Sequence, residues 1–347
     1  MIFSIIWGDV TRKLFHHEMS LFLPALLSIQ NLEVSLRNPL DDNRGAVLRG
    51  ISLKLDEGQR LALVGESGCG KSMTALSILN LLPKPPMEVT GGTIYFKDKD
   101  IKTLTREKWE AIRGRDIGIV FQDPVTSLNP VFTVGLQIVE TLQKHLFLSK
   151  NEAHKRALTL LGEVGLPDPE RLMNQYPHQL SGGMCQRVMI AMAVACGPSL
   201  LIADEPTTAL DVTVQTQILD LVFKLTQQNK MAVLLITHDL RIVKGHADRV
   251  VILYAGEVME EGTPNEIFER AQHPYTEGLL ASMPQFDQRG HDLASIGGVV
   301  PSPFERFTGC VFADRCARVQ NKCRVEKPDL GFNKTGHGVR CFYPSEK

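Results

Sequence analysis

Several short segments of the chain are almost entirely apolar and rich in branched side chains. They cover residues 61–65, 117–121, 200–204, 232–237 and 250–256. Runs of this length and composition are typical of strands in a parallel sheet that is covered on both faces. Helical patterns lie between some of them, such as SMTALSILNLL after the first run and VTVQTQILDLVFKLTQQ before the fourth. This alternation predicts an α/β core.

The segments around this core follow other patterns. LLSIQNLEVSL, LRGISLKL and GTIYF alternate or are flanked by turn signals, which favours an antiparallel sheet ahead of the core. Strand-like runs are scarce at about residues 123–180, where NEAHKRALTLLGEVG has the periodicity of an amphipathic helix, so we expect a mainly helical insert. After about residue 285, Pro, Gly and Cys become more frequent and helical periodicity fades, which predicts a separate small module.

A chain of 347 residues exceeds one ordinary core, so one large or two to three smaller folding units are expected. We divide it into an N-terminal extension at residues 1–25, an α/β domain at residues 26–285 and a Cys-rich module at residues 286–347. The 38 Lys and Arg residues balance 39 Asp and Glu residues, so the global basic excess of a nucleic-acid-binding protein is missing. We therefore expect no nucleic-acid partner.

The N-terminus reads MIFSIIWGDVTRKLFHHE. Its apolar run precedes the basic residues, whereas a secretory signal has its charges first, and it is shorter than the roughly 20 apolar residues that span a bilayer. We interpret it as a loose extension, with Met19 as the candidate true start; a short membrane-surface helix is the alternative. No other stretch is apolar enough to span a membrane, so we expect a cytosolic protein, in which persistent disulfides are rare.

The segment GESGCGKS follows a predicted strand and opens a predicted helix. It fits the phosphate-binding pattern G-x-x-x-x-G-K-[ST] at every fixed position. In this pattern the glycines let consecutive N–H groups face phosphate oxygens, Lys71 reaches the β- and γ-phosphates, and Ser72 supplies a hydroxyl to Mg²⁺. The candidate nucleotide-binding residues are therefore Gly65, Glu66, Ser67, Gly68, Cys69, Gly70, Lys71 and Ser72.

The segment LLIADEPT places two acids directly after another apolar run. Asp204 is the candidate for holding Mg²⁺ through water, and Glu205 is the candidate general base for the attacking water. A solvated strand end is the alternative interpretation of this pair.

The segment LSGGMCQR, from Leu180 to Arg187, resembles the signature sequence of ABC-type ATPases. Ser181 can cap a helix there, while Gly182 and Gly183 leave the backbone bare, which forms a second anion-binding helix end. An ordinary capped helix is the alternative interpretation. The resemblance implies that Ser181 and Gly183 contact the γ-phosphate of ATP bound to the P-loop of a partner subunit.

The remaining motifs of this family are present in order. The resemblance implies that Gln122 of the Q-loop contacts Mg²⁺ or water, that Asp211 of TALD lies at the dimer interface, and that His238 of LLITHD holds the γ-phosphate. There is one departure from the family pattern. An aromatic residue usually stacks on adenine near the end of the first strand, and Leu36 stands there, with Arg37 or a residue of the following loop as a possible substitute.

The resemblance covers roughly residues 26–345. It implies a P-loop ABC ATPase core of α/β class with an antiparallel β subdomain, a helical insert subdomain and a small Cys-rich C-terminal module. QDPVTSLNPVFTVGLQI, HPYTEGLL and GCVFADRCARVQNKC resemble the oligopeptide, dipeptide and nickel importer subfamily. In such importers two ATPase subunits, paralogous or identical, drive two membrane permeases that are fed by an extracytoplasmic substrate-binding protein. The implied location is the cytoplasmic face of the inner membrane.

The C-terminal cysteines are Cys310, Cys316, Cys323 and Cys341. Their spacing differs from the short pairs of zinc ribbons, and taken alone it leaves a metal centre and idle thiols equally open. The subfamily resemblance implies a bound metal centre of structural role, with a [4Fe–4S] cluster favoured over zinc. The basic residues nearby are Arg315, Arg318, Lys322 and Arg324. They could offset the charge of a cluster, but a solvated face is the favoured interpretation.

The expected function is that of an ATP-hydrolysing subunit of an ABC importer, which takes up peptides or a related small solute with ATP and Mg²⁺. The first alternative is a soluble ABC ATPase acting on nucleic acid or ribosomes, although such proteins usually carry long coiled coils or two fused cassettes. The second is a catalytically dead regulatory subunit, against which Lys71, Asp204, Glu205 and His238 argue. An exporter ATPase is disfavoured by the C-terminal module.

Overall fold

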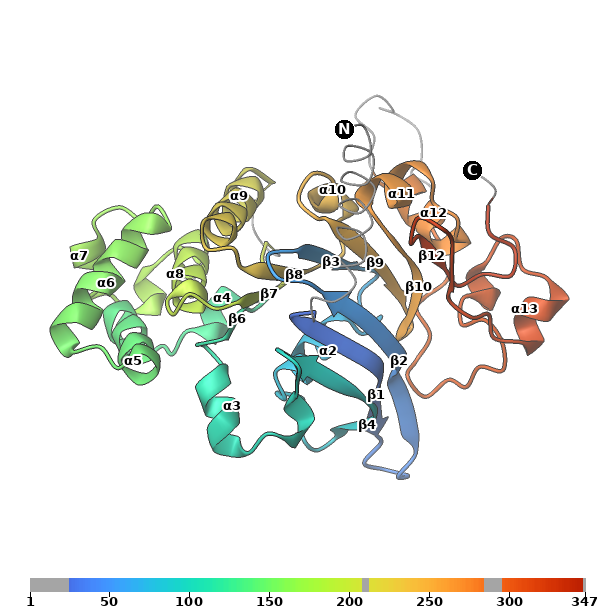
Figure 1. The fold of residues 1–347 in the computed structure, drawn as a ribbon, viewed down its shortest axis with the longest axis horizontal. Coiled ribbons are helices and arrows are strands. Elements are labelled where there is room, and N and C mark those ends of the chain that lie inside the picture. Colours follow the sequence, from blue (N-terminus) through green and yellow to red (C-terminus); the bar gives the residue numbers. More distant parts are fainter. Residues whose placement is uncertain (1–24, 208–211, 284–294, 346–347) are drawn as a thin grey trace, which may run out of the picture.

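The computed structural model describes residues 25–207, 212–283 and 295–345, and two sheets organise this part of the chain (Figure 1). The smaller sheet has the strand order β2-β1-β4-β5. Its strands are β1 (Leu27–Arg37), β2 (Arg44–Leu55), β4 (Met87–Phe96) and β5 (Lys99–Asp100), and they pair antiparallel. This confirms the antiparallel sheet that the alternating segments predict.

The larger sheet has the order β11-β12-β10-β9-β3-β8-β7-β6. The five apolar runs of the sequence are its parallel strands: β3 (Arg60–Val64), β6 (Ile117–Val120), β7 (Leu200–Asp204), β8 (Ala232–Thr237) and β9 (Arg249–Tyr254). Their side chains are apolar on both faces because both faces are covered. On β3, Leu61 and Leu63 pack toward the antiparallel sheet, while Ala62 and Val64 pack on the opposite side.

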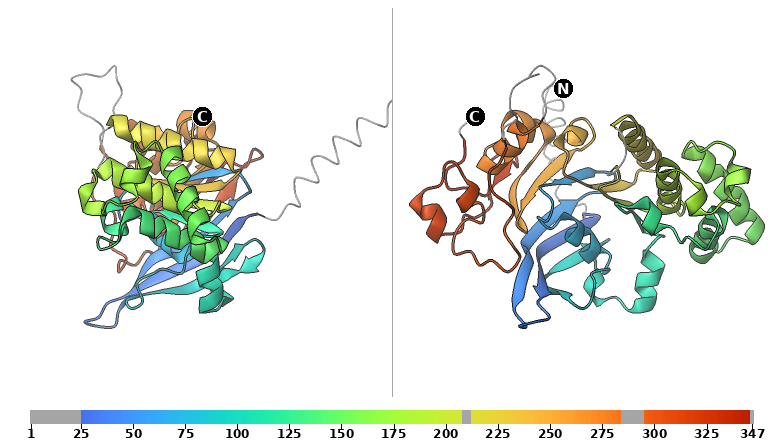
Figure 2. Two further views of the ribbon diagram at one scale, coloured as in Figure 1. Left: turned by 90° about the vertical axis from the view of Figure 1, so that its left-hand side faces the viewer. Right: turned by 180° about the vertical axis from the view of Figure 1, so that it is seen from behind.

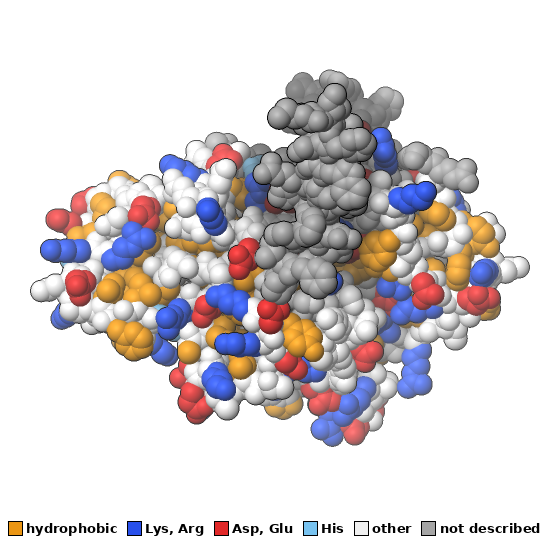
Figure 3. Space-filling view, viewed as in Figure 1, with side chains coloured by type: hydrophobic (Ala, Val, Ile, Leu, Met, Phe, Trp, Pro, Cys, Tyr) orange, Lys and Arg blue, Asp and Glu red, His pale blue; other side chains and the backbone are white. Residues whose placement is uncertain are grey.

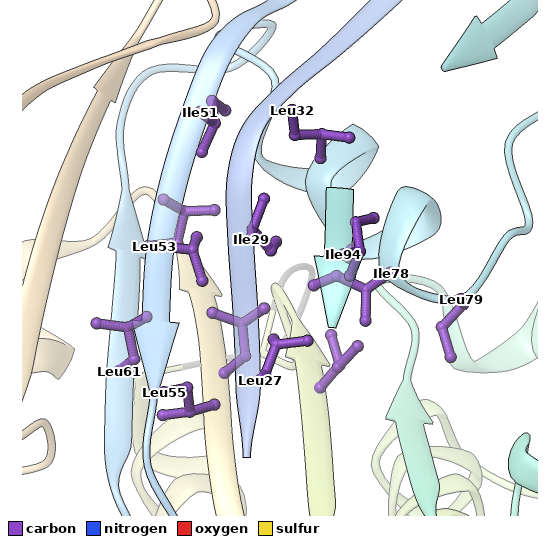
Figure 4. Packing of buried hydrophobic residues seen from close by; sticks show 14 of the residues in the cluster. Leu27, Ile29, Leu32, Ile51, Leu53, Leu55, Leu61, Ile78, Leu79 and Ile94 are labelled. Atoms are coloured by element: carbon purple, nitrogen blue, oxygen red, sulfur yellow. The ribbon is translucent and has the colours of Figure 1, made fainter. Parts of the chain in front are cut away.

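Helices complete the two layers. The core below the large sheet joins β1 and β2 to the C-terminal end of α2 (Lys71–Ile78); Leu27 and Ile29 meet Ile94 and Ile78 there (Figure 4). The opposite face is covered by the helices that follow the later strands (Figure 1). These are α9 (Val212–Gln228), α10 (Leu240–Val243), α11 (Pro264–Glu269) and α12 (Pro274–Ala281). A short 3-10 turn (Ile101–Thr103) and α3 (Arg106–Ile112) follow the small sheet.

The segment at about residues 123–180 is helical, as its periodicity predicts. It comprises α4 (Pro124–Ser127), α5 (Val134–Leu146), α6 (Lys150–Glu163), α7 (Pro169–Leu172) and a 3-10 turn (Pro177–Gln179), and it leads into α8 (Gly182–Val194). Ser149 and Glu152 form a capping box that begins α6. These helices share a hydrophobic core with α8, α9 and the strands β6 and β7, and they lie at the end of the molecule opposite the C-terminal segment (Figure 2).

The C-terminal region shares structure with the core in two ways that its sequence does not predict. After a 3-10 turn (Ala313–Arg315) and α13 (Asn321–Val325), strands β11 (Gly331–Phe332) and β12 (Gly338–Val339) extend the large sheet, β12 pairing with β10 (Glu257–Gly262). Phe312 also packs against the rings of Tyr254 and Tyr275 in a shared core. This region is therefore continuous with the core rather than set apart from it.

Residues 1–24, the greater part of the predicted N-terminal extension, lie outside the described residues. Across the ranges that are described, no helix combines the length and apolarity needed to cross a membrane. On the face shown in Figure 3, Lys and Arg side chains are interspersed with Asp and Glu, in keeping with the balanced charge of the chain.

Candidate functional site

The candidate phosphate loop joins β3 to α2. Gly68 and Gly70 have φ angles of 82° and 109°, in the left-handed region that favours glycine, so the backbone turns sharply before the helix. At Gly70, a Cβ atom would also lie 2.6 Å from Cδ2 of Leu48 on β2. The positive φ angles and the close approach of Leu48 explain why glycine occupies these positions. The sharp turn places the N-terminus of α2 at the loop.

Lys71 lies folded across this loop. Its Nζ donates to the main-chain oxygens of Gly65 at 2.8 Å and Glu66 at 3.0 Å. The same Nζ is 3.7 Å from Oε1 of Glu205, and the Lys71 side chain is only 4% exposed. The amine is therefore held at the loop with its charge close to a carboxylate.

Ser72 and Asp204 meet beside Lys71. The Ser72 hydroxyl donates to Oδ1 of Asp204 at 3.0 Å. Burial raises the pKa of Asp204, and the hydrogen bond from Ser72 opposes that shift. A hydroxyl and a carboxylate are the hard oxygen ligands that Mg²⁺ prefers, so this pair fits a magnesium ion shared with a nucleotide.

Glu205 lies at the centre of a polar cluster. Its Oε2 accepts from Nε2 of Gln122 at 3.1 Å and lies 3.3 Å from Nδ1 of His238. The hydrogen bond with Glu205 raises the pKa of His238. The backbone of Glu205 is in the left-handed region, with φ of 45°. Its main-chain N–H donates to the main-chain oxygen of Ile236 on β8 at 2.9 Å. A non-glycine residue held there stores about 1–3 kcal/mol of strain, a feature that clusters at functional sites.

The structure thus brings together side chains from four predicted motifs that lie far apart in the sequence. They are Lys71, Ser72, Gln122, Asp204, Glu205 and His238. They converge because the parallel strands β3, β6, β7 and β8 end at the same edge of the sheet.

The predicted signature residues lie elsewhere. The Ser181 hydroxyl accepts from the N–H of Met184 at 3.3 Å and so caps α8, as expected. Ser181 and Gly182 are exposed, and a Cβ atom on Gly182 would meet nothing within 4 Å. Over the described ranges, no hydrogen bond or ion pair joins Ser181, Gly182 or Gly183 to the phosphate loop. Asp211, the candidate interface residue, lies outside the described residues.

Cys69 does not present its side chain to the site. It is 1% exposed within the core below the sheet, and burial raises the pKa of its thiol to about 11. Only its main chain is available to a nucleotide.

Leu36 pairs with Gly45 across β1 and β2, where the family resemblance expects an aromatic side chain. A Cβ atom on Gly45 would lie 2.9 Å from the ring of Phe304, a residue of the C-terminal segment. Arg37, the other candidate, forms an ion pair with Asp42. The aromatic ring beside this position therefore comes from the opposite end of the chain, which no local sequence signal indicates.

The four C-terminal cysteines line one cavity, together with Phe312. Three of them accept a backbone N–H from the residue two positions later, namely Cys310, Cys316 and Cys341. Burial and the neighbouring thiols raise the pKa of Cys310 to about 11. Amide donors aimed at sulfur are a recurring feature of thiolate-bound metal centres, so the donor set fits one. Within the described ranges, however, no three His, Cys, Asp or Glu side chains are arranged to hold a single ion.

Arg315 corrects an expectation. Its sequence context predicts a solvated charge, but its side chain is 7% exposed and forms an ion pair with Glu66 of the phosphate loop. The sequence alone carries no signal for this contact.

Comparisons with known proteins agree with this geometry. A family model described as ABC transporter matches residues 48–208, and one described as the C-terminal region of oligopeptide/dipeptide transporters matches residues 259–323. The chain is 47% identical over 327 residues to the dipeptide transport ATP-binding protein DppD of Bacillus subtilis (strain 168), covering 94% of this chain and 96% of the relative. It is 48% identical over 328 residues to the oligopeptide transport ATP-binding protein AppD of the same organism, covering 94% and 98%.

A solved structure is similar as well. It is a dimeric ATP-binding cassette in a post-hydrolysis state bound to ADP and Pi, with a TM-score of 0.60 at 30% identity over 69% of this chain and 98% of that chain. The relatives match 94% of the chain. The first family model includes the phosphate loop and the strand β7 that ends at Asp204, and the second includes Cys310, Cys316 and Cys323. The chain therefore belongs to the oligopeptide/dipeptide family of ABC transporter ATP-binding proteins.

Proposed function

We propose that this chain is the ATP-hydrolysing subunit of an ABC importer for dipeptides or oligopeptides. The observation that carries the proposal is the convergence of Lys71, Ser72, Asp204, Glu205 and His238 at one edge of the sheet. The names of the relatives, dipeptide and oligopeptide transport ATP-binding proteins, indicate the class of solute.

The proposed chemistry assigns one task to each side chain. Lys71 exchanges its main-chain acceptors for the β- and γ-phosphates of ATP. Ser72 and Asp204 would hold a Mg²⁺ ion, which when bound would supply positive charge to offset that of the phosphates. Glu205 accepts a proton from the attacking water, while Gln122 and His238, which both contact its carboxylate, orient that water and the γ-phosphate.

The proposed active form contains two ATPase subunits. Ser181 and Gly182 are exposed at the N-terminus of α8, and within the described residues no hydrogen bond or ion pair joins them or Gly183 to this chain's own phosphate loop. An uncovered helix N-terminus of this kind suits the γ-phosphate held by a second subunit, whether identical or paralogous, and Asp211 would lie at the same interface. The related cassette, which was solved as a dimer, supports this arrangement.

The proposed complex also contains two permeases and an extracytoplasmic substrate-binding protein, which places this chain on the cytoplasmic face of the membrane. The helical insert, at about residues 123–180, follows Gln122 directly, and Gln122 contacts Glu205, so closure of the dimer would move the insert against the permease.

For the domain organisation we propose an ATPase domain at residues 26–285 and a Cys-rich module at residues 286–347 that packs on it. Within the module, Cys310, Cys316, Cys323 and Cys341 would hold a [4Fe–4S] cluster in a structural role. A cluster uses one thiolate for each iron, so it suits thiols that share a cavity without converging on one point, an arrangement that is less favourable for zinc. Anaerobic purification followed by iron, sulfide and zinc analysis tests this; metal-free protein with four alkylatable thiols would contradict it.

Reconstitution with the permeases of a dipeptide or oligopeptide importer tests the function itself. ATP hydrolysis by the complex in vesicles is expected to rise when the binding protein is loaded with a dipeptide or oligopeptide, and labelled peptide should accumulate. Stimulation by nickel alone would change the solute class, and stimulation by DNA or ribosomes in place of peptide would refute the importer assignment. Lack of any hydrolysis would indicate a regulatory subunit.

A further inference from the structure

Glu66, the second residue of the phosphate loop, is bound by a residue from the cysteine-bearing segment. Both terminal nitrogens of the Arg315 guanidinium donate to its carboxylate, at 2.7 Å to Oε2 and 3.0 Å to Oε1. The two residues are 249 positions apart in the sequence. A two-pronged contact between a planar guanidinium and a carboxylate fixes distance and orientation together, which a single charge contact does not.

Arg315 is itself held in place by the core and by its own segment. Its remaining donors reach the main-chain oxygens of Gly297 at 2.8 Å and Ile296 at 3.1 Å. Its guanidinium lies 5.6 Å from the ring centroid of Tyr254, whose hydroxyl it also reaches at 3.4 Å. All three guanidinium nitrogens of Arg315 make hydrogen bonds and the side chain is only 7% exposed, so its position against the loop is fixed.

A second contact holds the main chain of the same loop residue. The N–H of Glu66 donates to the hydroxyl of Tyr275 at 3.0 Å. Tyr275 is fully buried, and its ring packs 4.7 Å from that of Tyr254 and 5.2 Å from that of Phe312. Phe312 lies between Cys310 and Cys316 in the sequence and lines the same cavity as the thiols. The cysteine-bearing segment therefore contacts the side chain of Glu66 directly through Arg315, while the backbone of Glu66 is held by Tyr275 of α12, a residue whose ring packs against Phe312 of that segment.

Glu66 also determines where Lys71 lies, because its main-chain oxygen is one of the two that accept from Nζ, at 3.0 Å. A displacement of Glu66 therefore displaces the amine that binds phosphate in the proposed function.

We propose that Arg315 is a positioning residue for the phosphate loop, which holds Glu66 and Lys71 in the nucleotide-binding arrangement and thereby couples the cysteine-bearing segment to ATP affinity. The proposal rests on the proposed function, since it assumes that ATP binds at Lys71. Cys316, which lines the thiol cavity, follows Arg315 directly in the sequence. A change in the order of that cavity therefore moves Arg315, and the ion pair between Arg315 and Glu66 transmits the change to the loop.

Coupling of this kind is reciprocal. If Arg315 makes the nucleotide site more favourable for ATP, then bound ATP must make the arrangement of residues 309–325 more favourable by the same factor. A contact that only fastens the C-terminal region to the core does not require ATP to change the protection of that region. This difference separates the two roles.

The test measures the Kd of ATP in the presence of Mg²⁺, together with hydrogen exchange of residues 309–325 with and without ATP, on the full-length chain. Arg315→Ala is expected to weaken ATP binding about 2- to 30-fold, the range for residues that act on a site through another residue. ATP should slow exchange of residues 309–325 in the native protein and fail to do so in the variant. The double variant with Glu66→Ala should be no weaker than the weaker single variant.

The matched control is Arg324→Ala. Arg324 lies in the same segment and forms an ion pair with Asp314 at 3.0 Å, but that pair is mostly exposed and does not involve the loop. It should leave both the Kd and the ATP-dependent protection unchanged. Arg315→Lys keeps the charge without the two-pronged geometry and should give an intermediate Kd; it also serves if Arg315→Ala does not fold.

A native Kd together with native ATP-dependent protection in Arg315→Ala or Arg315→Lys would overturn the proposal. Equal losses in the Arg315 and Arg324 variants would assign Arg315 a purely structural role and overturn it as well. If the native protein did not bind ATP at all, the proposed function would fail along with it, and that outcome is distinct from the other two.

Discussion

Replacing Glu205 with Gln removes a charge from the centre of the polar cluster while preserving shape. In the native protein its carboxylate accepts from Gln122 at 3.1 Å, lies 3.3 Å from Nδ1 of His238 and lies 3.7 Å from Nζ of Lys71. An amide of the same size can keep one of these acceptor contacts, but it cannot take a proton from water. Hydrolysis should therefore fall much more than binding.

The two effects have different expected sizes. Loss of general-base catalysis lowers the rate about 10²- to 10⁴-fold, which is an increase in the barrier of about 3–5 kcal/mol. Binding should stay the same or tighten. At 3.7 Å the attraction between Lys71 and Glu205 is on the order of 4 kcal/mol at an effective dielectric of 20, and ATP must compete with it. Both side chains are nearly buried, at 4% and 12% exposure, so solvent screens this interaction only weakly.

The assay measures phosphate release by the assembled transporter and, separately, the Kd of ATP for the isolated subunit. Glu269→Gln is the matched control, because it makes the same chemical change at a residue whose ion pair with Lys244 is mostly exposed. It should leave the rate nearly unchanged. Turnover in Glu205→Gln within about tenfold of the native rate would refute the role of Glu205 as base, provided that the partner subunit carries the same substitution.

Three further predictions follow from contacts at and around the site. The Glu205 hydrogen bond raises the pKa of His238, so the stability that this pair contributes is fully present below the ordinary pKa of 6.5 and is lost as pH rises through the native-state pKa. Urea unfolding should therefore show that His238→Gln is less stable than the native protein at low pH but not at high pH, and a pH-independent difference would contradict this. The carboxylate of Glu260 is fully buried and accepts hydrogen bonds from the main-chain N–H groups of Gln272 and His273 and from the ring of His337. Glu260→Ala should therefore lower the free energy of unfolding by about 3–5 kcal/mol, and an unchanged denaturation midpoint would contradict a stabilising role for these contacts. The ring of Phe304 lies beside Gly45, where the adenine of ATP is expected to stack, so Phe304→Ala should weaken ATP binding by about 1–3 kcal/mol and Phe304→Tyr should not. Equal ATP affinities in the native protein and both variants would place the adenine elsewhere.

The elements and the chemistry of the phosphate site are predictable because their signals are local. GESGCGKS is contiguous, and its conformation follows from two glycines and the helix that begins at Lys71. The parallel strands are predictable because both of their faces are buried, which makes each run apolar throughout. The joint position of Asp204, Glu205 and His238 follows from the rule that parallel strands end at the same edge.

Contacts between distant segments required the tertiary structure. An arginine beside a cysteine has the same local sequence whether it is solvated or buried, and only packing brings Arg315 to Glu66. The same holds for the Phe304 ring beside Gly45 and for the pairing of β12 with β10. Short strands and single side chains carry too little periodicity to reveal their partners.

By itself, the sequence determined the α/β core, the antiparallel sheet, the helical insert and the side chains available for phosphate chemistry. Each of these depends on residue type and near-neighbour spacing. The tertiary structure alone decided that the cysteine-bearing region contacts the phosphate loop through Arg315 and that Tyr275 of α12 holds the same loop residue. Such contacts depend on how the whole chain folds, because only packing brings together residues that are 249 positions apart and buries the Arg315 side chain.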